Sequence, residues 1–359
     1  MLSLLLIIFS FVISLVLTGL LFRYASSRSL IDIPNERSSH AIPTPRGGGL
    51  AIVITYLITL VILVLTNELS SPYFWAMFVA GGGVALMGFV DDHGHIAARW
   101  RLLTHFVASG LILFWLGGLP ALSVFGVDID LGVAGDLLAV ISLVWWLNLY
   151  NFMDGIDGLA AVETLTISLS AVMLLWLGGT SGTEAACLLL LLLAASVLGF
   201  LFWNKPPAQI FMGDVGSTFL GFMLGLLAIV TIIQGLLSPW VWLILGGAFI
   251  VDATVTLLRR MLKGERWFEA HRSHAYQKAT IRLILYFEST KSLAAERARA
   301  KAHGTVSLLV LGINVLWLLP LAYFAQSLPT WGIGMVLIAW LPLVLLVFYF
   351  EVGQTRNAC

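Results

Sequence analysis

Five aspartates stand in short polar stretches that border long apolar runs of the sequence. Their positions are Asp91, Asp92, Asp154, Asp157 and Asp214. Few basic residues neighbour them, so the carboxylates would repel one another, and each would cost roughly 2.5–3.5 kcal/mol inside an apolar layer. A divalent cation bound among them is the simplest compensation. The alternative for each aspartate is a helix N-cap, where Asp is common.

The chemistry of these side chains selects the kind of metal ion. Carboxylates are hard oxygen ligands, and no cysteine lies near them in the sequence. Such ligands favour Mg²⁺, with Mn²⁺ as the alternative, over zinc. Flanking glycines permit tight helix starts, whose free N–H groups favour anions such as phosphate. These glycines are Gly155, Gly158, Gly213 and Gly216.

Polar residues outside the acidic stretches are further candidates for substrate binding. Asn148 and Asn151 lie on one face of a helix, where substrate, metal-bound water or another helix would satisfy their amides. Arg46 follows two prolines and precedes three glycines, so it binds a phosphate or anchors the chain at the basic side of a membrane. Arg101 is one more candidate for substrate binding.

A stretch at 267–277 places His271, Arg272 and His274 between aromatic residues. Two histidines without cysteines are too few for zinc. A clamp for a diphosphate or a nucleotide fits these residue types, and a solvated interfacial loop is the alternative. Residues 279–303 are then predicted to form one amphipathic basic helix on the membrane surface.

Membrane-spanning helices must hold these residues in place. Of the 359 residues, 60% are hydrophobic and 11% are charged, whereas soluble proteins carry about 25% charged residues. We predict an all-α polytopic integral membrane protein, one domain over residues 1–359, with about eleven spans. The predicted spans are 1–22, 47–65, 73–90, 102–118, 134–151, 160–178, 185–203, 215–233, 239–258, 305–325 and 331–350.

The basic residues support this topology. With the N-terminus outside, in the periplasm, all 19 Lys and Arg residues fall in the predicted inner segments and none in the outer loops. Since positive charge gathers on the cytoplasmic side, the C-terminus and all five aspartates are predicted to be cytoplasmic. The inner segments are 23–46, 91–101, 152–159, 204–214, 259–304 and 351–359.

Smaller features complete the expected topology. The first span lacks a basic n-region and a cleavage site, so we expect a retained helix. The outer stretch at 123–131 alternates polar and apolar residues and predicts a small hairpin. Cys187 lies in an apolar run and Cys359 is the last residue, so no disulfide framework is expected.

Four sequence motifs run in order along most of the chain. They are Pro-Thr-Pro-Arg-x-Gly-Gly at 43–49, Asp91-Asp92, Asn-x-x-Asn-x-x-Asp-Gly-x-Asp-Gly-Leu-Ala at 148–160 and Phe-Met-Gly-Asp-x-Gly-Ser at 211–217. Together they resemble the motifs of the polyprenyl-phosphate N-acetylhexosamine-1-phosphate transferases of glycosyltransferase family 4. The resemblance implies a membrane enzyme that moves a sugar 1-phosphate from a UDP-aminosugar to undecaprenyl phosphate, uses Mg²⁺ and releases UMP.

The resemblance also implies roles for individual residues. Asp214 matches the family's metal ligand, with Asp154 as the second candidate. The positions that match its essential acids are Asp91, Asp92, Asp154 and Asp157. The positions that match its nucleotide and catalytic cleft are Asn151, Asn204, Phe211 and Gly213.

One motif separates the branches of the family. The branch that uses UDP-muramoyl-pentapeptide carries three histidines in the last large inner loop, where this chain has His271-Arg272-Ser273-His274. The chain is more similar to the branch that starts O-antigen or related surface polysaccharides in the bacterial inner membrane; the pentapeptide branch is the alternative. UDP-GlcNAc is the default donor, with UDP-FucNAc and UDP-QuiNAc as options. No nucleic-acid partner is expected, and a homodimer is an option that the sequence leaves open.

The expected reaction is attack of the lipid phosphate on the β-phosphorus of the UDP-sugar. A phosphate monoester with a second pKa near 6 is mostly dianionic at pH 7, so deprotonation contributes little and Asp91 or Asp92 is an optional base. A covalent phospho-aspartate at Asp154 is the alternative. An ion-coupled transporter is the rival from another class, although its acids would lie in mid-membrane. A glycosyltransferase that releases UDP and an assembly scaffold are further rivals.

Overall fold

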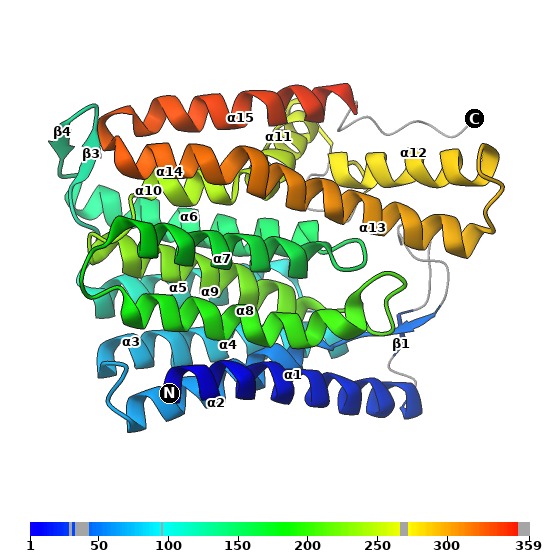
Figure 1. The fold of residues 1–359 in the computed structure, drawn as a ribbon, viewed down its shortest axis with the longest axis horizontal. Coiled ribbons are helices and arrows are strands. Elements are labelled where there is room, and N and C mark those ends of the chain that lie inside the picture. Colours follow the sequence, from blue (N-terminus) through cyan, green and yellow to red (C-terminus); the bar gives the residue numbers. More distant parts are fainter. Residues whose placement is uncertain (29–30, 33–42, 95, 266–271, 351–359) are drawn as a thin grey trace.

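The computed structural model describes residues 1–28, 31–32, 43–94, 96–265 and 272–350. These residues form a helical bundle with two small two-stranded sheets, which confirms the predicted all-α class. Most helices run along the long axis of the molecule, and the β3–β4 hairpin (Leu122–Val124 and Val127–Ile129) lies at one end (Figure 1). This hairpin confirms the one predicted at 123–131.

The other elements of the first half carry the labels of Figure 1. They are α1 (Leu2–Ser27), β1 (Ile31–Asp32), β2 (Thr44–Pro45), α2 (Gly49–Leu65), α3 (Ser71–Trp75), the π-helix η1 (Ala76–Ala80), α4 (Gly81–Gly94), α5 (Ala98–Leu116), α6 (Gly132–Met153) and α7 (Leu159–Gly178). The second half contains α8 (Glu184–Asn204), α9 (Asp214–Ile233), α10 (Pro239–Leu245), α11 (Gly247–Leu262), α12 (Ala275–Ser289), α13 (Ala295–Ile313), the π-helix η2 (Asn314–Leu318), α14 (Leu319–Ser327), the 3₁₀ turn η3 (Pro329–Trp331) and α15 (Gly332–Tyr349).

Eight helices of the described chain are long and apolar enough to cross a membrane. The pair α10 and α11, bent by 75° at its break, adds a ninth if the two helices form one span rather than a re-entrant loop. Each predicted span overlaps one of the helices or helix pairs, although α2, a shorter apolar helix, and α5 are not among the eight. The chain is therefore a multi-pass membrane protein, while the count of eleven and the orientation stay predictions.

The predicted single helix at 279–303 is wrong. The chain forms two helices there, because α12 ends at Ser289 and α13 begins at Ala295. Between them Ser292 takes a positive φ of 49°, and the chain turns back. The turn buries Phe287 against alanines of α13, and this packing outweighs the continuous helical pattern of the sequence.

Helix α9 lies at the centre of the bundle. Of its most apolar 18-residue stretch, 89% is buried. Glycines let other helices approach its first turn closely. A Cβ on Gly88 of α4 would lie 2.6 Å from the carbonyl oxygen of Asp214, and one on Gly216 would lie 2.7 Å from the Cα of Gly49 in α2. These contacts fix the start of α9, and with it Asp214, against the ends of α2 and α4.

Candidate active site

The structure brings all five predicted aspartates together at one end of the bundle. Asp91 and Asp92 lie in the last turn of α4, and Asp214 is the first residue of α9. The other two, Asp154 and Asp157, follow α6. Burial, followed by the negative charge of Asp214 and then of the other neighbouring aspartates, raises the pKa of Asp154 to about 8. The cluster is therefore short of positive charge.

Asp92 caps the start of α9. Its Oδ1 accepts the N–H of Asp214 at 3.0 Å and its Oδ2 accepts the N–H of Val215 at 3.1 Å. The side chain is buried, and Gly213 next to it has a φ of +76°. A Cβ on Gly213 would lie 2.7 Å from Asp92 Oδ2, so glycine is required there.

The start of α9, which Gly213 and Gly216 flank, is occupied by the carboxylate of Asp92. The first N–H groups of α9 do favour an anion, but the anion is the carboxylate of Asp92 rather than a phosphate. These two N–H groups are therefore taken by a carboxylate, and phosphate binding at the glycine-flanked helix starts stays a prediction. The helix-cap alternative describes Asp92 well, and a catalytic role for it stays a prediction.

The carboxylate of Asp214 is more exposed than that of Asp91, its neighbour in the site. Its side chain is 34% exposed, and that of Asp91 is 9% exposed. Arg101 on α5 places Nη1 at 2.6 Å from Asp91 Oδ2 and 3.6 Å from Asp214 Oδ2. Asn151 donates from Nδ2 to Asp214 Oδ1 at 2.8 Å and to Ser217 Oγ at 3.0 Å. Arg101 and Asn151 thus orient Asp214, with Arg101 shared between two acids.

Asp157 joins two loops and a helix. Its Oδ2 accepts the N–H of Ala208 at 3.0 Å and lies 3.2 Å from Nδ1 of His303 on α13. His303 is buried, with 1% of its surface exposed. These contacts hold the segment after α6 against the one that leads into α9, so Asp157 has a clear positioning role, while a catalytic role stays a prediction.

Mg²⁺ is the metal ion that these carboxylates are predicted to bind. No three His, Cys, Asp or Glu side chains of the described residues form a ready-made metal group. Mg²⁺, however, keeps several waters and commonly uses one or two carboxylates together with substrate phosphates. Asp214 is partly exposed and its charge acts on Asp154. Asp214 and Asp154, two neighbouring carboxylates of which one is partly exposed, fit this mode of binding.

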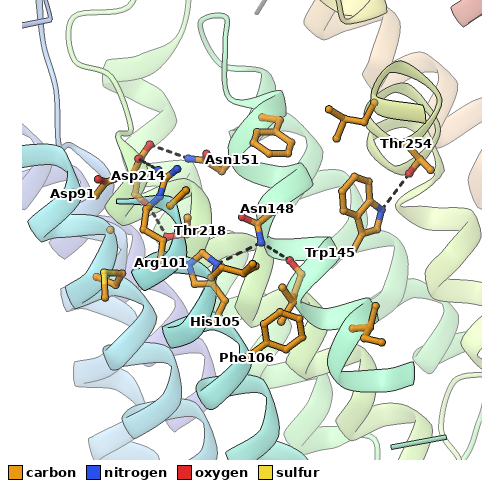
Figure 2. A pocket seen from close by; sticks show the side chains of 18 of the residues that line it. Asp91, Arg101, His105, Phe106, Trp145, Asn148, Asn151, Asp214, Thr218 and Thr254 are labelled. Atoms are coloured by element: carbon orange, nitrogen blue, oxygen red, sulfur yellow. Dashed lines mark hydrogen bonds and ion pairs between the residues drawn. The ribbon is translucent and has the colours of Figure 1, made fainter. Parts of the chain in front are cut away.

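A cavity of about 490 Å³, lined by Asp91 and Asp214 among the five aspartates, lies between α4, α5, α6 and α11 (Figure 2). Its polar end contains Asp91, Arg101, Asn151 and Asp214. The remaining wall is mostly apolar and includes Met87, Leu102, Phe106, Ile141, Trp145, Leu257 and Leu258. The cavity therefore suits a ligand with an anionic head and a hydrocarbon chain.

The predicted substrate-binding residues fall into two groups. Asn148, Asn151 and Arg101 line the cavity. The others hold the backbone around the site, at Arg46, Asn204, Phe211 and Gly213. Arg46 donates to the backbone oxygen of Asp92. Asn204 is buried and uses its amide to accept the N–H of Gly158 and to donate to the oxygen of Ile210.

Phe211 pairs with the motif at 43–49 through the backbone. Its N–H donates to the oxygen of Pro45 at 2.8 Å, and its own oxygen accepts the N–H of Gly48 at 2.9 Å. Two motifs far apart in the sequence are thus one structural unit. Binding of substrate by this group of residues stays a prediction.

The stretch around His274 packs against the loop after α6. His274 is buried at the N-cap of α12, and Tyr276 donates from Oη to the backbone oxygen of Phe152 at 3.1 Å. Burial, followed by the positive charge of Arg299, lowers the pKa of Arg272. Tyr276, close in the chain to the predicted clamp residues Arg272 and His274, thus lies at the end of α6 near Asp154. His271 lies outside the described residues.

Three polar residues of this region were missed by the sequence analysis. Asp252, His105 and His303 are all buried. Asp252 caps α12 by accepting the N–H groups of Ala275 at 2.8 Å and Tyr276 at 3.0 Å. Asp252 and His105 lie inside predicted spans, where a polar residue is itself a signal. No local signal in the sequence links His303 to Asp157.

The fold and the site define a multi-pass membrane protein with a carboxylate cluster at one end of its helices. Glycosyl transferase family 4 matches this chain at residues 74–232. A "Probable undecaprenyl-phosphate N-acetylglucosaminyl 1-phosphate transferase" from Bacillus subtilis (strain 168) is 30% identical over 283 residues, which cover 76% of each chain. The chain belongs to glycosyl transferase family 4, as the resemblance in its motifs implied.

Proposed function

We propose that the protein transfers an N-acetylhexosamine 1-phosphate from a UDP-sugar to undecaprenyl phosphate and releases UMP. The observation that carries this proposal is the cavity, which joins an apolar wall to a cluster of carboxylates and Arg101. A polyprenyl phosphate has the same two parts, a hydrocarbon chain and an anionic head. The name of the Bacillus subtilis relative supports the acceptor and the sugar phosphate.

The reaction is an in-line displacement at phosphorus. An oxygen of the lipid phosphate forms a bond to the β-phosphorus of the UDP-sugar, and the bond from that phosphorus to the bridging oxygen breaks. UMP leaves with the bridging oxygen, and the lipid carries a sugar diphosphate. The attacking phosphate is already mostly dianionic at pH 7, because its second pKa is near 6.

The contacts of the two adjacent acids favour this direct attack. Asp91 is paired with Arg101, and both oxygens of Asp92 accept backbone N–H groups. Neither acid is needed as a base for a dianionic nucleophile. A covalent route would use Asp154, and a phosphoryl group trapped on that residue would overturn direct attack.

Two anions must meet, so positive charge is the main requirement of this site. Asp214 and Asp154 would hold Mg²⁺, which when bound neutralises phosphate charge. Arg101 supplies a guanidinium at the polar end of the cavity. Asn151 holds Asp214 in place through its amide.

UMP release tests the proposed function. Membranes that contain the protein should release UMP from UDP-GlcNAc only when undecaprenyl phosphate and Mg²⁺ are supplied. Release of UDP would indicate a glycosyltransferase that moves the sugar alone, and release of neither nucleotide would favour a transporter. Asp214→Asn should abolish release while the protein still folds and inserts.

The finer assignment is the branch that starts O-antigen or related surface polysaccharides, with the site on the cytoplasmic face of the bacterial inner membrane. The short His271-Arg272-Ser273-His274 motif and the one-sided distribution of Lys and Arg support it. A panel of UDP-GlcNAc, UDP-FucNAc, UDP-QuiNAc and UDP-muramoyl-pentapeptide with the purified protein tests the donor. Turnover of the pentapeptide donor alone would contradict this branch.

A further inference from the structure

His105 is a buried polar residue in the wall of the cavity. It follows Arg101 by four residues on α5, so it lies on the same face, about 6 Å further along the helix. Its side chain is 3% exposed and lines the cavity beside Phe106 and Asn148 (Figure 2). Buried polar groups normally have hydrogen-bond partners, so both ring nitrogens must be accounted for.

Asn148 determines which ring nitrogen carries the hydrogen. Its Nδ2 donates to the backbone oxygen of Val144 at 2.7 Å, which fixes the orientation of the amide because an amide oxygen there would face another oxygen. The same Nδ2 lies 3.4 Å from Nδ1 of His105. An amide nitrogen only donates, so Nδ1 accepts and the hydrogen of the neutral ring is on Nε2.

The Nε2–H group is available to a ligand. Within the part of the chain that the structure describes, His105 has its hydrogen bond at Nδ1 and none at Nε2. Of the other donors at this end of the cavity, Nη1 of Arg101 is shared between two carboxylates, and Nδ2 of Asn151 donates to Asp214 and Ser217. His105 therefore offers a hydrogen bond that no described side chain competes for.

We propose that Nε2–H of His105 donates a hydrogen bond to a phosphate oxygen of the polyprenyl phosphate acceptor. This inference rests on the proposed function, which places that lipid in the cavity. A phosphate whose chain follows the apolar wall comes to lie at the polar end of the cavity, next to Arg101, Asp91 and Asp214. His105 lies one helical turn from Arg101 on α5. As a neutral donor it holds the phosphate beside Arg101 and adds no buried charge to the apolar wall.

In this role His105 strengthens binding of the lipid acceptor and does not affect binding of the UDP-sugar. Binding of undecaprenyl phosphate and of undecaprenol, which has the same chain without the phosphate, separates this role from packing. His105→Leu should weaken binding of undecaprenyl phosphate about tenfold or more, as expected for a hydrogen bond to a charged group. Binding of undecaprenol should be unchanged, which also shows that the variant is folded.

Two further variants sharpen the test. His105→Gln carries an amide N–H near the position of Nε2 and should recover most of the affinity for undecaprenyl phosphate. Phe106→Leu changes the same wall without a polar group and should affect both lipids equally. In turnover assays, His105→Leu should raise the KM for the lipid acceptor and leave that for the UDP-sugar unchanged.

Equal loss of both lipids in His105→Leu, or loss of neither, would overturn the inference. A raised KM for the UDP-sugar alone would also overturn it. The binding measurements need no turnover, so they remain decisive if wild-type protein releases no UMP. Absence of UMP release would count against the proposed function, and undiminished binding of undecaprenyl phosphate would count against His105.

Discussion

Asp92 is the residue on which the geometry of the carboxylate cluster depends most. Its two oxygens accept the N–H groups of Asp214 and Val215 at 3.0 and 3.1 Å. Asp92→Ala leaves one buried and one partly buried N–H group without a partner, and each costs about 1–3 kcal/mol. The free energy of unfolding should therefore fall by about 2–6 kcal/mol. Asp92→Asn keeps one acceptor oxygen, so a fall of about 1–3 kcal/mol is expected.

Thermal unfolding of the purified protein in detergent, followed by the fluorescence of its 13 tryptophans, measures this effect. Wild type should be the most stable, Asp92→Asn intermediate and Asp92→Ala the least stable. Turnover should fall in the same order, because the cap sets the position of Asp214.

Asp136 provides a matched control far from the acids. Its Oδ1 accepts one N–H, from Leu119, at 2.8 Å, and it lies near the start of α6, just after the β3–β4 hairpin. Asp136→Ala should lower the melting temperature and leave turnover unchanged. An Asp92→Asn protein that melts like wild type but has no turnover would refute the cap and make Asp92 a catalytic group.

Three further predictions concern the residues around the site. His303→Leu should lower turnover several-fold, because Nδ1 of His303 accepts the backbone N–H of Asp157 at 3.3 Å and one hydrogen bond is worth about 0.5–1.5 kcal/mol. His303→Asn, with a side-chain oxygen near the position of Nδ1, should retain most turnover; equal losses would indicate packing alone. Gly213→Ala should melt below Gly235→Ala, since φ is positive at both (76° and 66°) but only at Gly213 would a Cβ meet a carboxylate oxygen, at 2.7 Å; equal melting temperatures would argue against this close approach. Asp252→Ala should speed amide hydrogen exchange in the first turn of α12, and unchanged exchange would count against its cap.

The helices could be predicted because each apolar run is a local property of the sequence. The clustering of the aspartates could be predicted too, since the ends of successive spans return to the same side of a membrane. Asp91, Asp154 and Asp214 follow this rule and meet at one end of the bundle. Composition and topology were sufficient for this part of the site.

Contacts between distant segments could not be predicted in the same way. Asp92 accepts an N–H group from a residue 122 positions later, and His303 lies beside Asp157, 146 positions away. Nothing in the local sequence distinguishes an aspartate that caps another helix from one that binds a ligand. The break between α12 and α13 depends likewise on the burial of Phe287 against a later helix.

The transfer of the β-phosphorus tests the central claim most directly. Purified protein should be incubated with undecaprenyl phosphate, Mg²⁺ and UDP-GlcNAc labelled at the β-phosphorus, with Asp214→Asn in parallel. We expect the label in the lipid fraction, unlabelled UMP in equal amount in the aqueous fraction, and neither product with Asp214→Asn. Label that stays in aqueous UDP while the sugar alone reaches the lipid would contradict the proposed reaction.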